Sequence, residues 1–441
     1  MNQKERLELA KWVASRTKKG GADEAAVEIF YARGVEVECR DRTIDKLEES
    51  TQNGLTLRVY LDNRYSTNST NDLRKESMEK FIDEAVAMTK YLSEDPYRTL
   101  PDPKYYEGLD NSIDLKICDK GYDDISSEQR VKLARDMEDD ALSRSDKLVS
   151  CSSSFSDGVF ESVKVHSNGF DGTRRSSIFQ AGVSVGVDDG QGGRPSGYDY
   201  RAYRFLKDIP PADTFGKLAV DRALARIGQT KIESGSYDVI IENLARTSVL
   251  GALQQPLSGR NLQQKNSCFE GKLGEQIFSE NLTVSEDPFI PEALGSQLYD
   301  DDGMPRRKRT IIDKGVLKEF LINWYYSRKL GVEPTGGGIS NVVFGLGKRS
   351  LDEMIKSMER GIFITGFIGG NSNPTTGDFS FGIVGHLVEG GKLAKPINEM
   401  NISGNILEFW KHLVEVGNDP HPYSSIMRPS MYFKEVSLSG V

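Results

Sequence analysis

The chain has few cysteines and no long apolar run. Its four cysteines are spread along the sequence without a CxxC pair, at Cys39, Cys118, Cys151 and Cys268. This excludes a disulfide framework and is typical of a reducing compartment. No apolar run approaches the ~20 residues needed to cross a bilayer, and the first residues, MNQKERLELAKW, lack the apolar segment of a signal peptide. We therefore expect a cytoplasmic protein without a membrane segment.

Histidine is also scarce, and its placement excludes a common catalytic motif. The four histidines are far apart in sequence, at His166, His386, His412 and His421. A helical HExxH or HExxxH motif places two imidazoles on one helix face, with the glutamate positioned to activate a metal-bound water. None of these histidines has a glutamate or a second histidine at that spacing. We expect no catalytic residue and no metal ligand in this chain, and hence no cofactor of its own.

An excess of basic charge is absent as well. The formal net charge is −9, with 57 Lys and Arg against 66 Asp and Glu. Such a balance disfavours non-specific binding to nucleic acid or to an anionic membrane. We expect neither to be a partner.

The length and the hydrophobic periodicity predict an α+β protein of two domains. A chain of 441 residues with 37% hydrophobic residues exceeds what one hydrophobic core usually supports. We predict an N-terminal α+β domain over residues 1–235, built from repeated strand–strand–strand–helix units. We predict a β-rich, barrel-like C-terminal domain over residues 236–441.

Alternating apolar residues predict the strands of the N-terminal domain. Residues 27–31, 35–39 and 55–61 alternate, with Gly34 and Gly54 at the expected turns, and residues 78–92 have helical spacing. A second set follows. It comprises a helix capped by Ser126 and Gln129, strands around 163–165, 183–187 and 198–202, and a helix over 213–227 that stops at Gly228. The two sets indicate a duplication of architecture, without convincing identity between residues.

The C-terminal domain is predicted to contain hairpins and few long helices. After a strand at 239–241 and a helix around 245–255, RTIIDKGVLKEFLI predicts a hairpin that turns at Asp313-Lys314-Gly315. FSFGIVGHLVEGGKLAKPI predicts another, turning at Gly390-Gly391. A helix between them should begin at Ser350, with Glu353 as its capping-box partner, and stop at Gly361.

Three motifs resemble functional sites but favour structural interpretations. Asp300-Asp301-Asp302-Gly303 could hold Mg²⁺ or Ca²⁺, yet three consecutive carboxylates cannot all face one ion, so a turn or ion pairs are favoured. The segment Gly345–Ser350 lacks the first glycine and the Ser or Thr of a phosphate-binding loop. Cys268 is expected to be a small buried hydrophobic residue and not a nucleophile.

Two glycine-containing segments beside predicted strands are candidates for contact with a peptide. They are Thr335–Gly338 and Thr376–Ser380. Glycines beside strands let another backbone approach closely, and an extended peptide can then pair with a strand edge, although a tight turn is the favoured explanation for any single glycine. The predicted substrate-path residues are Thr335, Gly336, Asn341, Gly377 and Asp378.

The order of several segments resembles the TldD/PmbA family, and specifically its TldE (PmbA) branch. The segments are FEGKLGEQIF, YDDDGMP, IIDKGVLKEFLINWYYSRKLG, EPTGGG, SNVVF, TGDFSFG and VGND. In the TldD branch, the stretch that corresponds to Leu257–Ser267 carries a HExxxH zinc motif, and a cysteine follows the VGND-like segment. This sequence has no histidine in the first stretch and no cysteine in VGNDPHPYSSIMRPSMYF.

The resemblance implies the non-catalytic subunit of a cytoplasmic zinc metalloprotease that trims peptides and unfolded segments. In such a pair a TldD-like partner supplies the zinc, and this chain encloses the peptide substrate and activates the partner. A homodimer is an alternative state in isolation. Two other functions remain open: a homodimeric hydrolase with its own metal site at Asp300–Asp302, and a binding module without enzymatic activity that modulates gyrase or a toxin–antitoxin pair.

Overall fold

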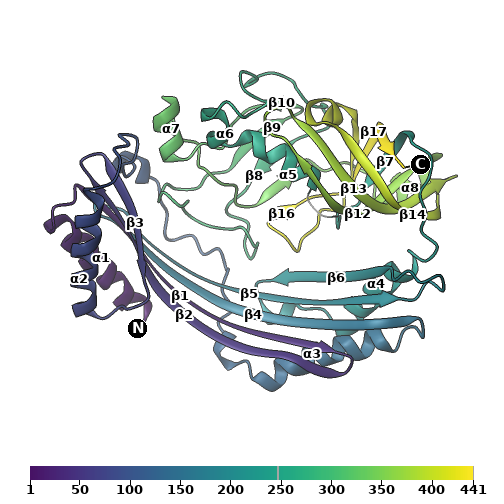
Figure 1. The fold of residues 1–441 in the computed structure, drawn as a ribbon, viewed down its shortest axis with the longest axis horizontal. Helices are drawn as coiled ribbons and strands as arrows, with labels where there is room; N and C mark the ends of the chain where they lie inside the picture. The colour runs from purple at the N-terminus through teal and green to yellow at the C-terminus, as the bar shows by residue number, and fades with distance from the viewer. Residues whose placement is uncertain (246–247, 441) are drawn as a thin grey trace.

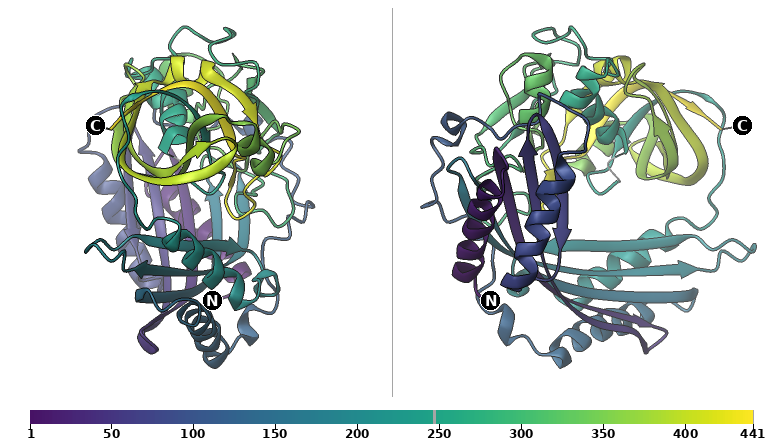
Figure 2. Two further views of the ribbon diagram at one scale, coloured as in Figure 1. Left: turned by 90° about the vertical axis from the view of Figure 1, so that its right-hand side faces the viewer. Right: turned by 60° about the vertical axis from the view of Figure 1, so that its left-hand side comes forward.

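The computed structural model describes residues 1–245 and 248–440. Its N-terminal region is one six-stranded antiparallel sheet in the order β3-β2-β1-β4-β5-β6. The C-terminal region lies on the opposite side of this sheet from α3 and α4 (Figures 1 and 2). The elements of the N-terminal region are α1 (Gln3–Lys19), β1 (Glu24–Arg40), β2 (Thr43–Leu61), β3 (Arg64–Thr70), α2 (Lys75–Thr89), α3 (Ser127–Leu142), β4 (Leu148–His166), β5 (Asp171–Val187), β6 (Ser196–Tyr203) and α4 (Ala212–Leu224).

The N-terminal region consists of two units with the same order of elements. Each unit is a helix, three antiparallel strands and a second helix, and the units join where β1 pairs with β4. Gly34 of β1 lies opposite Gly158 of β4 near the middle of this pairing. The predicted units of three strands and a helix are therefore present, and each also begins with a helix. The capping box of Ser126 and Gln129 is present at the start of α3.

Gly34 and Gly54 do not form the turns that we predicted. β1 continues through Gly34, which lies opposite Ser50 on one side and Gly158 on the other, and Gly54 lies within β2 opposite Phe30. Pairing on both sides of β1 outweighs the weak strand propensity of glycine. The actual turn between β1 and β2 is at Asp41 and Arg42, which both have positive φ.

All four long helices of this region pack on one face of the sheet. Odd-numbered residues of β1 and β4, such as Val27, Val37, Phe155 and Val163, are buried in the two clusters beneath the helices. Because side chains alternate along a strand, the even-numbered residues of the same strands point to the other side. We call this second side the open face; it carries Glu28, Phe160, Ser162, Lys164, Arg174, Gln180, Tyr198 and Tyr200.

The C-terminal region contains a closed five-stranded barrel, as predicted. The strands follow one another as β14-β13-β12-β7-β17, and pairing of β14 with β17 closes the ring. They are β7 (Gly235–Ile241), β12 (Arg360–Ser372), β13 (Asp378–Glu389), β14 (Lys392–Asn405) and β17 (Met431–Ser439), with β15 (Leu413–Val416) added beside β17. The domain boundary at residues 235 and 236 stays a prediction; residue 235 opens β7.

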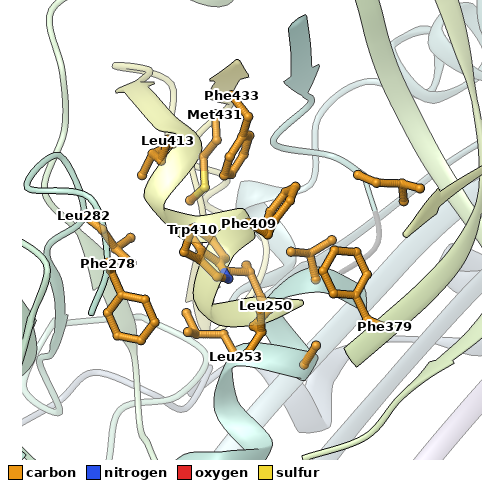
Figure 3. Close-up of a cluster of buried hydrophobic side chains, with 14 of the residues drawn as sticks. Leu250, Leu253, Phe278, Leu282, Phe379, Phe409, Trp410, Leu413, Met431 and Phe433 are labelled. Atoms are coloured by element: carbon orange, nitrogen blue, oxygen red, sulfur yellow. The ribbon is translucent and has the colours of Figure 1, made fainter. Parts of the chain in front are cut away.

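Aromatic side chains fill the barrel and the layer beneath it. Trp410 is 1% exposed, and the Phe409 and Phe433 rings stack with their centroids 4.4 Å apart (Figure 3). Phe379 meets the other side of Phe409 edge-on, at 5.4 Å. This core joins β13, β17 and the Ile406–His412 turn into one packed unit.

A second sheet, β10-β9-β8-β11-β16, lies beside the barrel together with short helices. Its strands are β8 (Val284–Glu286), β9 (Arg309–Asp313), β10 (Val316–Leu317), β11 (Val342–Phe344) and β16 (Ile426–Met427). The helices are α5 (Ser248–Gln254), α6 (Gly259–Gln263), α7 (Trp324–Leu330), α8 (Leu351–Ser357) and α9 (Ile406–Phe409). Residues 246 and 247, within the helix predicted around 245–255, lie outside the described residues.

Both predicted hairpins are present, and one predicted helix end is wrong. Lys314 and Gly315 have φ of 45° and 80°, the left-handed pair that a tight hairpin turn requires, and Gly390 and Gly391 turn β13 into β14. Ser350 and Glu353 form the expected capping box. The helix ends at Ser357 and not at Gly361, because Gly361 already pairs with Asp238 in the barrel.

Side-chain hydrogen bonds join the two regions. The Trp324 indole donates to Thr99 Oγ1 at 3.0 Å, the Tyr325 hydroxyl donates to Asp95 at 2.7 Å, and Arg222 pairs with Glu242. The described helices include none with the length and apolar character that a bilayer span requires.

The buried ion pair of Arg130 and Asp157 should be the most sensitive polar contact of the N-terminal region. The Arg130 Nε donates to Asp157 Oδ2 at 2.6 Å, with the two side chains 3% and 0% exposed. Asp157→Ala leaves a buried guanidinium without its counter-charge, and we expect the free energy of unfolding to fall by about 3–5 kcal/mol in urea titration. Asp136→Ala, which breaks an exposed pair with Lys132, should lower it by less than about 1 kcal/mol. Equal effects would contradict this account.

Candidate functional site

The four histidines occupy separate structural environments. Burial lowers the pKa of His166 to about 3 and that of His421 to about 4. The His166 Nδ1 lies 2.9 Å from the Tyr106 hydroxyl, and His386 Nε2 donates to the Ala225 carbonyl at 3.0 Å. His412 lies in a short 3₁₀ turn after α9. Three of the four are therefore neutral, buried side chains with roles in packing.

Residues 257–267, where the resemblance places the zinc motif of the TldD branch, form a short helix followed by an exposed turn. The segment runs from the end of a 3₁₀ turn through α6, which Ser258 caps by accepting a hydrogen bond from the Asn261 amide at 3.2 Å. Ser267 Oγ donates to the Pro256 carbonyl at 2.6 Å and closes the segment. Across residues 1–245 and 248–440, no group of three His, Cys, Asp or Glu side chains is arranged to hold a metal ion.

The acidic cluster Asp300–Asp302 forms a turn. Asp300 Oδ1 accepts hydrogen bonds from the amides of Asp302 and Met304, at 2.9 and 3.0 Å. Burial and the neighbouring Asp302 raise the pKa of Asp300 to about 7. Asp302 accepts from the Trp324 amide at 3.1 Å, whereas Asp301 is exposed. The three carboxyl groups therefore have different environments, as the turn interpretation requires.

The basic residues after this turn pair with other carboxylates. Arg306 and Arg309 both contact Glu286, which is 1% exposed, while Arg307 pairs with Glu319 and Lys308 with Asp287. Among the described residues, none of them forms an ion pair with Asp300–Asp302. Their partners are Glu286, Asp287 and Glu319, because β8 lies beside β9 in the sheet.

Thr335 and Gly336 line a cavity of about 390 Å³ together with Asp300. The carbonyl oxygens of Thr335 and Gly338 accept hydrogen bonds from Arg309, and Thr335 Oγ1 accepts from the Ile322 amide at 2.9 Å. These hydrogen bonds from Arg309 and Ile322 hold the Thr335–Gly338 loop in place.

The other predicted substrate-path residues lie elsewhere. Asn341 is fully buried; its amide donates to the Asp287 carbonyl and to Ser296 Oγ, and its oxygen accepts from the Gly295 amide. Gly377 ends the turn between β12 and β13 and is buried, whereas Asp378 is the exposed first residue of β13 and accepts a hydrogen bond from Asn405 at 2.9 Å. The structure brings Thr335 and Gly336 together in one cavity but does not add Asn341, Gly377 or Asp378 to it. Their contact with substrate stays a prediction.

The remaining sequence motifs have structural roles. Gly347 packs against the Val416 carbonyl so closely that a Cβ would lie 1.9 Å from that oxygen, and Arg349 pairs with Glu415. The segment Gly345–Ser350 is therefore a packed loop and not a phosphate site. Burial raises the pKa of Cys268 to about 11, so its thiol is a poor nucleophile at neutral pH.

Sequence reasoning did not find two cavities between the N-terminal and C-terminal regions, the second of which is lined mainly by α4 and the barrel. One, of about 430 Å³, is lined by Lys164 and Arg174 of the sheet and by Tyr299 and Asp301 of the acidic turn. A second, of about 590 Å³, lies between Tyr198 of β6 and barrel residues such as Phe363. Only the pairing of long strands reveals which side chains share the open face, since the residues come from segments far apart in sequence.

The fold and these cavities define a class of protein. It has two tandem units of helices and strands that share one sheet, and a small barrel that lies on the side of the open face. Profiles of three consecutive domains match the chain: PmbA/TldA metallopeptidase domain 1 over residues 25–89, the central domain over 120–227 and the C-terminal domain over 234–440. The chain belongs to the PmbA/TldD family.

Individual relatives agree with this assignment. The chain is 28% identical to the metalloprotease PmbA of Escherichia coli O157:H7, over 99% of this chain and 97% of that one. A crystal structure from Bacteroides thetaiotaomicron, named as a proposed modulator of DNA gyrase, is 35% identical, with a TM-score of 0.97 and complete coverage of both chains. TldE from Thermococcus kodakarensis, 22% identical, has the same fold with a TM-score of 0.88 over 98% of this chain and 100% of that one.

The raised pKa of Asp300 should make stability depend on pH. The folded state holds a proton on Asp300 up to about pH 7, whereas an unfolded aspartate releases it near pH 4. Asp300 therefore makes its full contribution to the free energy of unfolding below about pH 4. This contribution is lost as the pH rises toward 7, and the free energy falls by at most about 1.4 kcal/mol per pH unit. Asp300→Asn should remove this part of the slope in urea titrations, and the exposed Asp301→Asn should retain it. An unchanged slope in Asp300→Asn would contradict the assignment.

Proposed function

We propose that this chain is the non-catalytic, TldE-like subunit of a heteromeric zinc metalloprotease that acts on peptides and unfolded segments. A TldD-like partner supplies the zinc and the hydrolytic chemistry, and this chain encloses the substrate and activates the partner. The chain itself holds no cofactor. We place the pair in the cytoplasm.

The observation that carries this proposal is the open face of the six-stranded sheet. Four helices cover the opposite face, so the sheet is supported from one side and accessible from the other. Its accessible side has Ser154, Ser156 and Gln180 in the centre and Tyr198 and Tyr200 at the edge, and it also exposes Phe160 and Ile178. Such a surface can contact peptides of many sequences, because hydroxyl and amide groups donate and accept hydrogen bonds.

The absence of a ligand set supports the division of labour between two chains. A catalytic zinc needs three protein ligands and a second shell that orients them. The described residues offer no such group, and the segment at Leu257–Ser267 is closed by its own hydrogen bonds. What this chain can contribute to hydrolysis is enclosure: a wall that excludes bulk water strengthens the electrostatic interactions within the site.

Peptidase activity after mixing is the direct test. We expect no cleavage of an unfolded peptide by this chain alone, none or little by the TldD-like partner alone, and cleavage by the mixture. Cleavage by this chain alone would instead favour a hydrolase with its own site. Binding to intact gyrase or to a toxin–antitoxin pair without any cleavage product would favour the non-enzymatic module.

A bulky residue on the open face should interfere with this activity. Gln180 is exposed at the middle of β5, so Gln180→Trp adds an indole above the sheet without entering either core cluster. We expect kcat/KM of the mixture to fall by about tenfold, which corresponds to about 1.4 kcal/mol of lost transition-state stabilisation. Lys132→Trp, on the exposed side of α3, is the matched control and should leave kcat/KM unchanged. Equal activity of the two variants would exclude the sheet as a wall of the site.

The histidines provide an independent test of where the zinc is held. Alanine at His166, His386, His412 or His421 should leave one zinc per assembled pair, measured by atomic emission after gel filtration. His166→Ala and His421→Ala remove buried rings, so their folding is verified first by thermal unfolding. Loss of stoichiometric zinc in a folded variant would overturn the non-catalytic assignment.

A further inference from the structure

Arg174 is a partly buried guanidinium that lacks a carboxylate partner. Among the described residues it forms no ion pair, whereas its neighbour Arg175 pairs with Asp123 and Glu161. The Arg174 Nε is enclosed without a hydrogen-bond partner. Burial lowers the pKa of Arg174, and nearby Tyr299 and Asp301 act in the opposite direction. A cation in such a position is costly unless something binds it.

The side-chain hydrogen bond that Arg174 donates among the described residues is weak. Its Nη1 lies 3.5 Å from the Gln297 Oε1. With the Gln297 amide turned over, its oxygen accepts hydrogen bonds from the Arg306 Nε and Nη2 at 3.1 and 2.9 Å. The amide nitrogen then faces Arg174 and cannot accept a hydrogen bond from it.

The cavity that Arg174 lines carries charges of both signs, from Lys164 and Arg175 and from Glu28, Asp114, Asp300 and Asp301. Arg174 lies opposite Ser162 in the sheet, and Lys164 is the next open-face residue along β4. Arg204 is close by, and its guanidinium donates to the carbonyl oxygens of Ser177, Ala293 and Leu294. Lys164 donates to the Asp301 carbonyl at 2.9 Å and lies 3.8 Å from Glu28.

The cavity that Arg174 lines also has apolar walls. Its volume is about 430 Å³, and Ile113, Leu115, Phe160 and Leu298 contribute to its surface. Volumes of this order accommodate small ligands, and a few polar groups in an apolar cavity usually fix their orientation. A planar guanidinium is matched to a carboxylate, with which it forms two parallel hydrogen bonds.

We propose that Arg174 binds a ligand carboxylate in this cavity, and that the carboxylate is the C-terminal end of a short peptide. The apolar walls contact the side chains that precede the carboxylate. The carboxylate chemistry follows from Arg174 and its cavity alone. That the ligand is a peptide rests on the proposed function.

Isothermal titration of the full chain with tetra-alanine tests this proposal. We expect the free acid to bind about tenfold to a hundredfold more tightly than its C-terminal amide, the range for a hydrogen bond to a charged group. Arg174→Gln should abolish the difference, and Arg174→Lys should retain only part of it. Arg33→Gln, which removes a strand arginine paired with Glu49, is the matched control and should behave as wild type.

Thermal unfolding distinguishes a ligand-binding arginine from a structural one. Because Arg174 forms no ion pair among the described residues, Arg174→Gln should not lower the unfolding temperature, whereas loss of an ion-paired structural arginine would. Equal affinity for acid and amide, or an Arg174→Gln variant that still discriminates them, would overturn the proposal. Inorganic phosphate that binds while the peptide acid does not would overturn the carboxylate assignment.

Failure of this proposal and failure of the proposed function give different results. If the isolated chain binds the peptide acid and its amide equally, only the Arg174 proposal is overturned. Absence of cleavage in the mixture with a TldD-like partner, with discrimination intact, would overturn the subunit role and leave the Arg174 site in place.

Discussion

One-sided burial of the N-terminal sheet is the constraint on which the rest of the structure depends. Residues that alternate along strands of up to 19 residues bury one face under four helices, so the other face must remain accessible. A sheet covered on one side only can support a surface that is polar and still rigid. The barrel is then positioned across this surface by a small number of directional contacts, of which Arg222–Glu242 and Trp324–Thr99 are examples.

Charged residues of the C-terminal region hold its own loops in place. Glu286 binds two arginines, and Arg309 in turn holds the carbonyl oxygens of the Thr335–Gly338 loop. Asp300 closes its own turn with backbone amides. These charged side chains, which resemble a catalytic or metal site in the sequence, thus form hydrogen bonds and ion pairs within the protein. Arg174 differs from them because its buried Nε has no acceptor.

Local rules predicted the elements that depend on local interactions. The capping boxes at Ser126 and Ser350 and the hairpin turn at Lys314-Gly315 follow from a few neighbouring residues, and all are present. Gly34 was assigned to a turn because its pairing partners, Ser50 and Gly158, cannot be inferred from adjacent sequence. The same limit applies to the site. Thr335 and Gly336 were identified from glycine content, but Asp300, which shares their cavity, is brought there by the pairing of Tyr299 with Pro305.

The most direct test of the central claim is the metal content of this chain purified alone and exposed to excess zinc before desalting. The account predicts far less than one zinc per chain, because the described residues provide no ligand set. One zinc retained per chain through desalting would contradict it, and would mean that ligands assemble from positions that neither the sequence spacing nor the described structure brings together.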